Sequence, residues 1–204
     1  MMKRSMLIIL CCIWSKGLLY ADSPLTSITF YTLYWDNNII VKSKNEAILN
    51  DNSCKFLSSP SVNNGEKIAL INALGWKFEG QNNAKIYADF LKIKYKSKKT
   101  LSLSKLSASE LMCMAYLTAM DDYLHPQNAL PYIDKAIAIE GNSLSLHLIH
   151  TLLEAQIHSE DDWCAVWKSY EKLHEEQANY VQDVKSEVLI RVEEYLILYK
   201  SSCR

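Results

Sequence analysis

The sequence predicts an all-α protein of about eight to nine helices, and three observations lead to this fold class. Helix-breaking residues are scarce, with only five glycines and four prolines among 204 residues. Residues 39–41 are the one segment that suggests an extended conformation. Apolar residues recur at helical spacing over long stretches. The clearest of these stripes, near the end of the chain, consists of Val181, Val184, Val188, Val192, Tyr195 and Tyr199.

Breaks in the apolar pattern divide the chain into successive helices. We expect a first helix at residues 25–35 and a short second one at 44–49. The loop SSPSVNNG, the stretch GQNN and a linker rich in lysine and serine mark the next breaks. The remaining helices are expected at residues 66–76, 84–94, 108–120, 129–139, 144–157, 163–176 and 180–199.

The first 21 residues are typical of a secretory signal peptide rather than of the fold. Lys3 and Arg4 precede a short apolar run at 6–14, and the small residue Ala21 ends the segment. The alternative is a membrane anchor, but the run is shorter than the roughly 18 to 20 apolar residues that span a bilayer. We therefore expect an exported protein, periplasmic or secreted, whose residues 22–204 form a single domain with no transmembrane segment.

The charge of the expected mature chain argues against nucleic acid as a partner. Removal of Lys3, Arg4 and Lys16 changes the net charge from −1 to −4, and two arginines remain. A surface that binds phosphates normally has a basic balance and more arginine. The densest basic stretch, residues 92–99, is therefore interpreted as a solvated helix end and linker.

Four cysteines remain after the expected cleavage: Cys54, Cys113, Cys164 and Cys203. An even number in an exported protein indicates disulfides, and four cysteines allow three pairings. Pairing of neighbours in chain order would give Cys54–Cys113 and Cys164–Cys203. The alternative is four ordinary thiols, with Cys113 in a helix core. No C-x-x-C pair supports zinc binding or thioredoxin-type chemistry.

An internal similarity suggests that the helices form pairs. Residues 83–89 and 128–134 both match N-A-x-x-Y-x-D, 45 residues apart. The asparagines, Asn83 and Asn128, are expected to cap the helix that follows, because an asparagine side chain can accept a bond from a free N–H. Pro131 would lie in the first turn, where its missing N–H costs little.

Residues 129–143 resemble the second helix of a tetratricopeptide repeat. Ala129 and Ala136 match the small residues that this family places seven apart, Ile133 is the apolar residue between them, and Gly141 takes the place of the closing proline. The resemblance is best over residues 109–143 and degenerate over 144–178. It implies stacked antiparallel helix pairs, an α-solenoid, with a concave face that binds a peptide or a protein and no catalytic residues.

The stretch HLIHTLLEAQIH, residues 147–158, is the candidate metal site. On a helix, His147, His150, Glu154 and His158 share one stripe. The stripe is roughly 16 Å long, so one ion cannot contact all four side chains. At best His150 with Glu154, or Glu154 with His158, forms a two-ligand fragment, and a neighbouring helix would have to supply the other ligands. The alternative, which the surrounding leucines favour, is a solvated polar face opposite the apolar side.

A second candidate is the aromatic set Trp163, Trp167 and Tyr170, which shares one helix face. Aromatic side chains anchor many interfaces, although at helical spacing they more often belong to a core. Motifs of hydrolases, metalloproteases and nucleotide-binding enzymes are absent from the sequence.

We therefore expect a non-catalytic protein without a cofactor that binds another protein or a peptide, as an envelope assembly factor, an adaptor or an immunity-type inhibitor. The main alternative is a metal-binding protein or metal-dependent enzyme that uses the histidine stripe. A purely structural subunit is a third possibility.

Overall fold

A computed structural model describes residues 23–97 and 99–203, and the expected signal peptide lies outside these ranges. The described residues form nine α-helices and no strand, so the all-α prediction is confirmed. None of these helices has the length and apolarity to cross a membrane. Their bounds are α1 Asn38–Glu46, α2 Asp51–Leu57, α3 Asn64–Leu74, α4 Asn83–Lys94, α5 Ala108–Asp121, α6 Leu130–Ile139, α7 Leu144–His158, α8 Trp163–Glu176 and α9 Ser186–Leu196.

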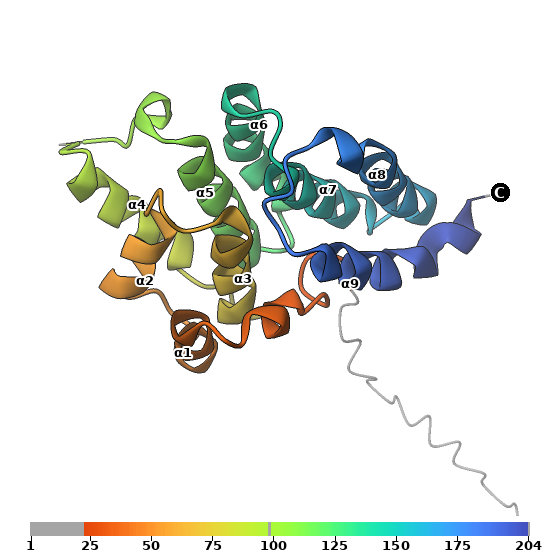
Figure 1. Cartoon of the computed structure of the whole chain (residues 1–204), viewed down its shortest axis with the longest axis horizontal. Helices are drawn as coiled ribbons and strands as arrows, with labels where there is room; N and C mark the ends of the chain where they lie inside the picture. Colours follow the sequence, from red (N-terminus) through yellow and green to blue (C-terminus); the bar gives the residue numbers. More distant parts are fainter. Residues whose placement is uncertain (1–22, 98, 204) are drawn as a thin grey trace, which may run out of the picture.

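The helices pack in chain order, so that each of α4 to α8 contacts the next one (Figure 1). Helices α3, α5 and α7 also contact one another and form an inner row. Helices α1 and α2 pack on α3, and α9 runs back across α8 at the other end. The chain thus forms an elongated stack with its N-terminal helices at one end and its C-terminal helices at the other.

Helices α5 and α7 are central because they are apolar on nearly every side. Most residues of both helices are buried, including the aromatic ring of Tyr116. The Tyr116 hydroxyl accepts a hydrogen bond at 3.0 Å from the Asn72 amide, which also donates to Ile28 O at 2.9 Å. A buried polar group that keeps its hydrogen bonds avoids most of the cost of leaving water.

The N-terminal helices differ most from expectation. Residues 39–41 lie inside α1 rather than in an extended segment, because the Asn37 side chain caps this helix and Ile40 packs in the core. The helix expected at 44–49 is not formed, because α1 ends at Glu46 and the next residue, Ala47, adopts a left-handed conformation with φ of 54°. Helix α2 then follows, with a capping box between Asn50 and Ser53.

Two further helices are shorter than expected. The region 25–35 contains only the 3-10 helix Phe30–Tyr34. The final helix starts at Ser186 rather than at residue 180, because residues 181–185 form an irregular segment that binds the start of α7. The last of the described 3-10 helices, Ile197–Ser202, continues α9 toward the end of the chain.

The capping roles expected for Asn83 and Asn128 are wrong. Neither α4 nor the turn before α6 has a side-chain cap of this kind. The buried Asn83 amide instead accepts a hydrogen bond from Leu49 N–H at 2.8 Å and donates to Gln81 at 2.6 Å. The Asn83 side chain therefore bonds to residues outside α4 instead of capping that helix. Pro131 does lie in the first turn of α6.

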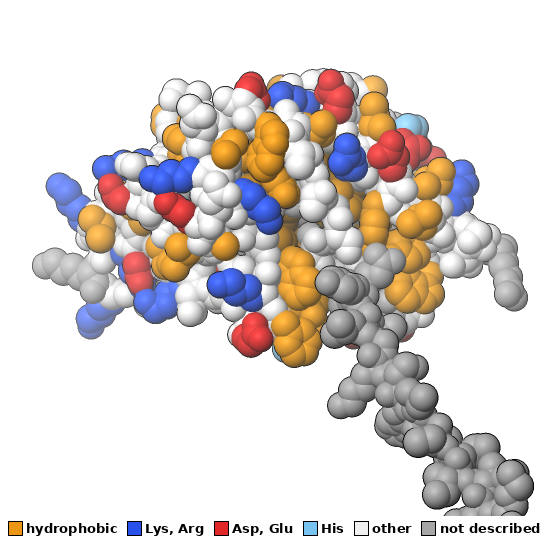
Figure 2. All heavy atoms as spheres, turned by 90° about the horizontal axis from the view of Figure 1, so that it is seen from below, with side chains coloured by type: hydrophobic (Ala, Val, Ile, Leu, Met, Phe, Trp, Pro, Cys, Tyr) orange, Lys and Arg blue, Asp and Glu red, His pale blue; other side chains and the backbone are white. Residues whose placement is uncertain are grey.

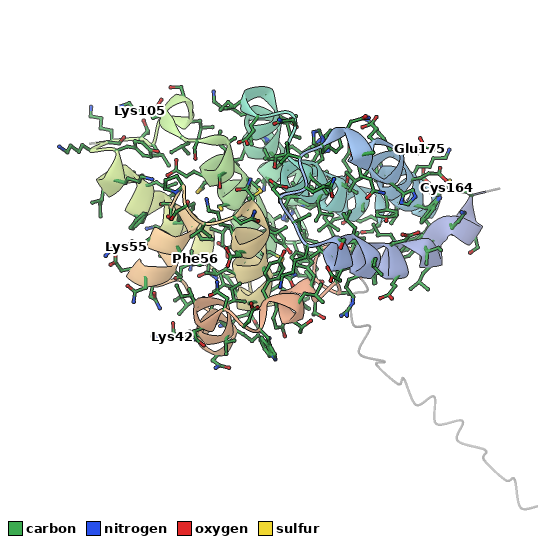
Figure 3. The ribbon with its side chains drawn as sticks, viewed as in Figure 1. Lys42, Lys55, Phe56, Lys105, Cys164 and Glu175 are labelled. Atoms are coloured by element: carbon green, nitrogen blue, oxygen red, sulfur yellow. A yellow bond between two sulfur atoms is a disulfide. The ribbon has the colours of Figure 1, made fainter. Side chains whose placement is uncertain are left out.

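One of the two expected disulfides is present. Cys164 and Cys203 are joined, which ties the start of α8 to the C-terminal end of the chain (Figure 3). Cys54 and Cys113 are free and buried, so the expected Cys54–Cys113 bond is wrong. Cys54 lies in α2, which packs mainly on α3 and α4, whereas Cys113 lies in α5. The two cysteines are neighbours in chain order but are not bonded in the fold.

Candidate functional site

The inner row of helices starts around a polar cavity of about 500 Å³, which we call the Lys67 pocket. Helices α3, α5 and α7 all begin there, and the N-terminus of a helix carries a partial positive charge. Lysine, carboxylate, amide and hydroxyl groups line the cavity, with a few apolar side chains at its rim. The polar residues used below are Asn64, Lys67, Lys94, Ser109, Glu110, Ser143 and Asp183.

Lys67 is the most unusual of these residues, because its side chain is charged and only 2% exposed. Its ammonium group donates one hydrogen bond, to Ser109 Oγ at 2.7 Å, and Ser109 donates in turn to Asn64 Oδ1 at 2.7 Å. Two of the three ammonium donors have no partner within the described ranges. Burial lowers the pKa of Lys67, while nearby groups that include Glu110 oppose this shift.

The carboxylate of Glu110, in the same pocket as Lys67, is already occupied by other donors. Glu110 is also 2% exposed, and it accepts hydrogen bonds from Lys94 Nζ at 2.7 Å, the Tyr95 hydroxyl at 2.7 Å and Ser107 N–H at 3.0 Å. Burial alone would raise the pKa of Glu110, but these bonds together hold it below its usual value. Glu110 therefore stays ionised without using the free donors of Lys67.

The carboxylate of Asp183, which also lines the Lys67 pocket, accepts four hydrogen bonds from neighbouring residues. Its Oδ1 accepts from the Ser145 N–H at 2.8 Å and from the Ser145 hydroxyl at 2.9 Å. Its Oδ2 accepts from the Ser143 hydroxyl at 2.6 Å and from Asn64 Nδ2 at 3.0 Å. The carboxylates of Glu110 and Asp183 are thus satisfied from within the pocket, whereas the Lys67 ammonium has two unused donors. The arrangement suits an incoming anionic or carbonyl group.

Gly65 allows this part of the Lys67 pocket to form. Its N–H donates to Asp183 O at 2.9 Å, and a Cβ at this position would lie 2.7 Å from the Tyr34 hydroxyl and 2.9 Å from Asp183 O. Any larger residue would push the 181–185 segment away from α3. Glycine is required here by close approach of the backbone rather than by its conformation.

The histidine stripe lies in a second, smaller cavity of about 280 Å³ between α6, α7 and α8, which we call the His150 pocket. His147, His150 and Glu154 line it, but His158 does not. His150 lies between two carboxylates, with Nδ1 3.4 Å from Glu154 and Nε2 3.5 Å from Asp134. Helices α6 and α8 flank α7, so these side chains line a groove and are half-buried rather than freely exposed to bulk water.

His150 and Glu154 shift each other's pKa in opposite directions. The hydrogen bond to Glu154 raises the pKa of His150, and the same bond lowers the pKa of Glu154. In the part of the chain that the structure describes, no group of three or more histidine, cysteine or acidic side chains is placed to hold a metal ion. The sequence-predicted ligand His158 is not brought into a common site with His150 and Glu154.

The three aromatic candidates have different environments. Trp167 and Tyr170 are buried, in agreement with the core alternative, and Tyr170 donates to Glu193 at 3.0 Å. Trp163 is 42% exposed and stacks on Tyr199, with ring centroids 5.1 Å apart. Of the three, only Trp163 presents a substantial surface to a partner.

The free cysteines do not provide a nucleophile. Burial raises the pKa of Cys54 to about 11 and that of Cys113 to about 12, so both thiols keep their protons at neutral pH.

Sequence reasoning missed Lys67 and Asp183. Lys67 follows a loop and precedes the apolar run IAL, so its sequence context resembles that of any exposed lysine at a helix start. Asp183 lies in a segment that was expected to be helical. One signal was present, since the pair Asn63-Asn64 before Gly65 marks a tight helix start.

The two ends of the stack carry opposite charge. Residues 23–107 contain twelve lysines and six acidic residues, a net charge of +6. Residues 108–203 contain six basic and sixteen acidic residues, a net charge of −10. Figure 2 shows lysines gathered toward the end where Figure 1 places α1 to α4.

Comparison with known proteins adds no family: no family model, curated protein or solved structure matches this chain.

Proposed function

We propose that this protein is an exported helical-repeat protein, similar to tetratricopeptide-repeat proteins, that binds another protein or a peptide and catalyses no reaction. The single observation that supports this most is the Lys67 ammonium, which is buried at the edge of a polar cavity with two unused donors. An isolated buried charge is costly, and a carboxylate from a partner would offset that cost.

The partner would present an acidic side chain or a chain terminus to the Lys67 pocket. The positive ends of α3 and α5 favour such a group, and two of the pocket's own carboxylates, Glu110 and Asp183, are already occupied by other donors. The exposed Val181 and the half-buried Val62 at the rim offer apolar contact beside the charge. An envelope assembly factor, an adaptor or an immunity-type inhibitor would all use recognition of this kind.

The proposal is tested by quantitative affinity purification from envelope extract with Lys67→Met as the variant. Lys105→Met is the matched control, since Lys105 is exposed and does not line the pocket (Figure 3). We expect a partner that is retained by the parent protein and by Lys105→Met and is lost from Lys67→Met. Circular dichroism would verify that both variants fold.

Two results would contradict the proposal. Retention of the same partner by Lys67→Met would exclude the Lys67 pocket as its site. Failure to enrich any protein with the parent chain, over repeated extracts, would oppose a binding function altogether.

A further inference from the structure

The His150 pocket has an unbalanced set of charges. Asp134 from α6, Glu154 from α7 and Glu176 from α8 line it, together with one lysine, Lys172. Lys172 is exposed and makes no ion pair among residues 23–97 and 99–203. The carboxylates therefore outnumber the cations that face them whenever His150 is neutral.

The central histidine cannot satisfy both of its neighbours. Neutral imidazole has one N–H, yet Asp134 and Glu154 approach opposite nitrogens of the His150 ring at 3.5 and 3.4 Å. One carboxylate is then left without a donor on the ring. Asp134 has no other hydrogen bond or ion pair in the described part of the chain, and neither has Glu154.

Two further features of the pocket point to a ligand. Thr151 is 5% exposed and lines the cavity, and its hydroxyl has no hydrogen-bond partner in the described structure. Tyr180 forms part of the wall, stacks on His147 with ring centroids 4.0 Å apart and donates its hydroxyl to Glu176 at 2.7 Å. Carboxylates, an aromatic ring and a free hydroxyl together favour an organic cation.

We propose that the His150 pocket binds an organic cation that carries a guanidinium group. A guanidinium matches the carboxylates in charge and in its planar array of donors, and the pocket of about 280 Å³ has room for a side chain of arginine size. A bare metal ion fits less well, because the described residues offer no three-ligand group. The guanidinium could belong to a small molecule or to an arginine of a peptide.

Binding of this cation opposes protonation of His150. A protonated His150 can donate to Asp134 and Glu154 at once, which occupies both carboxylates and reduces the negative charge that attracts the ligand. The other charged groups that face His150 are Lys172 from α8, which disfavours its protonation, and Asp134 from α6, which favours it. The ligand should therefore bind more weakly in mild acid than at slightly alkaline pH.

The test is an NMR titration of the His150 ring with two probes, agmatine and a short arginine-containing peptide, using the full chain. We expect saturable shifts of the His150 signals, a lower His150 pKa in the bound state and affinity that is about tenfold weaker near pH 5.5 than near pH 8. Binding of agmatine indicates a small-molecule site, whereas binding of the peptide alone indicates an arginine side chain.

The variant Glu154→Gln should weaken binding by about tenfold, because it removes one carboxylate without changing the size of the side chain. Glu160→Gln, at an exposed position outside the pocket, is the matched control and should bind like the parent. Lys67→Met should also bind the probes normally, which separates this inference from the proposed function. The inference is overturned if neither probe shifts His150, or if Glu154→Gln binds as tightly as the parent.

Discussion

The two ends of this helical stack use different means to hold similar helix packing together. The N-terminal end is basic, contains the free buried thiol of Cys54 and encloses a buried lysine with few partners. The C-terminal end is acidic and is closed by the Cys164–Cys203 disulfide. The acidic end thus has a covalent link in addition to its packing, whereas in the described residues the basic end has only packing and buried polar groups.

The segment 181–185 joins these two regions. Asp183 binds the start of α7 and also reaches Asn64 and Gly65 at the start of α3. Lys185 N–H donates to the Tyr34 hydroxyl at 3.2 Å, and Lys185 Nζ donates to Leu33 O at 2.6 Å. A short irregular segment therefore connects elements that are more than 100 residues apart in the chain, and it also builds one wall of the Lys67 pocket.

Loss of the disulfide should have the largest effect and should be confined to the acidic end. The bond joins residues 39 apart, and closing a loop of that length stabilises a fold by about 3–4 kcal/mol in the chain-entropy account. The double variant Cys164→Ser/Cys203→Ser should lose about this amount in urea unfolding. Hydrogen exchange should increase in α8 and residues 197–202 before it increases in α2 or α5.

Reductant provides the matched comparison. It should destabilise the parent protein and a Cys113→Ala variant by a similar increment, because Cys113 is a free thiol. An unchanged unfolding transition of the parent protein in reductant would show that the acidic end does not depend on its covalent link.

Asp183→Ala should have the next largest effect and should weaken the junction between the two ends. It leaves Ser143, Ser145 and Asn64 without their shared acceptor, and we expect a loss of about 2–4 kcal/mol in the free energy of unfolding. Asp36→Ala is the control, because its side chain is 84% exposed and lies 3.9 Å from Lys185. It should change stability by less than about 0.5 kcal/mol. Equal effects of the two variants would argue against a structural junction at 181–185.

Lys67→Met should change the free energy of unfolding by a smaller amount and in the opposite direction. A gain in stability would show that the buried charge destabilises the basic end. Burial lowers the pKa of Lys67 in the folded state. In the unfolded chain the side chain stays protonated up to its usual pKa of 10.5, so burying the charged lysine on folding costs free energy at neutral pH. We expect the variant to be as stable as the parent or more stable by about 1–2 kcal/mol at neutral pH. The difference should shrink as the pH rises toward 10.5, as measured by urea unfolding at several pH values. A clear loss of stability at neutral pH would show that Lys67 supports the fold instead.

Periodicity in the sequence predicted the long helices better than the short ones. Helices α5 to α8 were expected close to their observed positions, because each carries a sustained apolar pattern and a clear cap or break. Helices α1 and α2 were misplaced because their ends are set by local hydrogen bonds of Asn37, Asn50 and Ser53, which periodicity does not register. Segment 181–185 continued the apolar stripe in sequence but is held out of α9 by the bonds of Asp183.

The sites were less predictable than the fold. The stripe on α7 was recognised, and so was the closeness of His150 and Glu154, but the carboxylate of Asp134 comes from a different helix. Lys67 gained its unusual position only when α3 and α5 came together around Ser109. Single-helix patterns report which residues share a face, whereas a pocket depends on what the neighbouring helices place opposite that face.

The smallest expected effect is a pH dependence that arises from His150 and therefore belongs to the acidic end. The pKa of His150 is raised, so its pairing stabilises the fold fully below the usual value of 6.5 and is lost as the pH rises through the raised pKa. The pKa of Glu154 is lowered, so the pair also weakens as the pH falls through that lowered pKa. The variant His150→Gln should thus cost most near pH 6, by less than about 1 kcal/mol for this half-exposed pair, and little near pH 9. His158→Gln, one turn beyond Glu154 and outside the pocket, is the control for urea unfolding at the two pH values. A loss in His150→Gln that is equal at both pH values would mean that the ring stabilises α7 by packing rather than by charge.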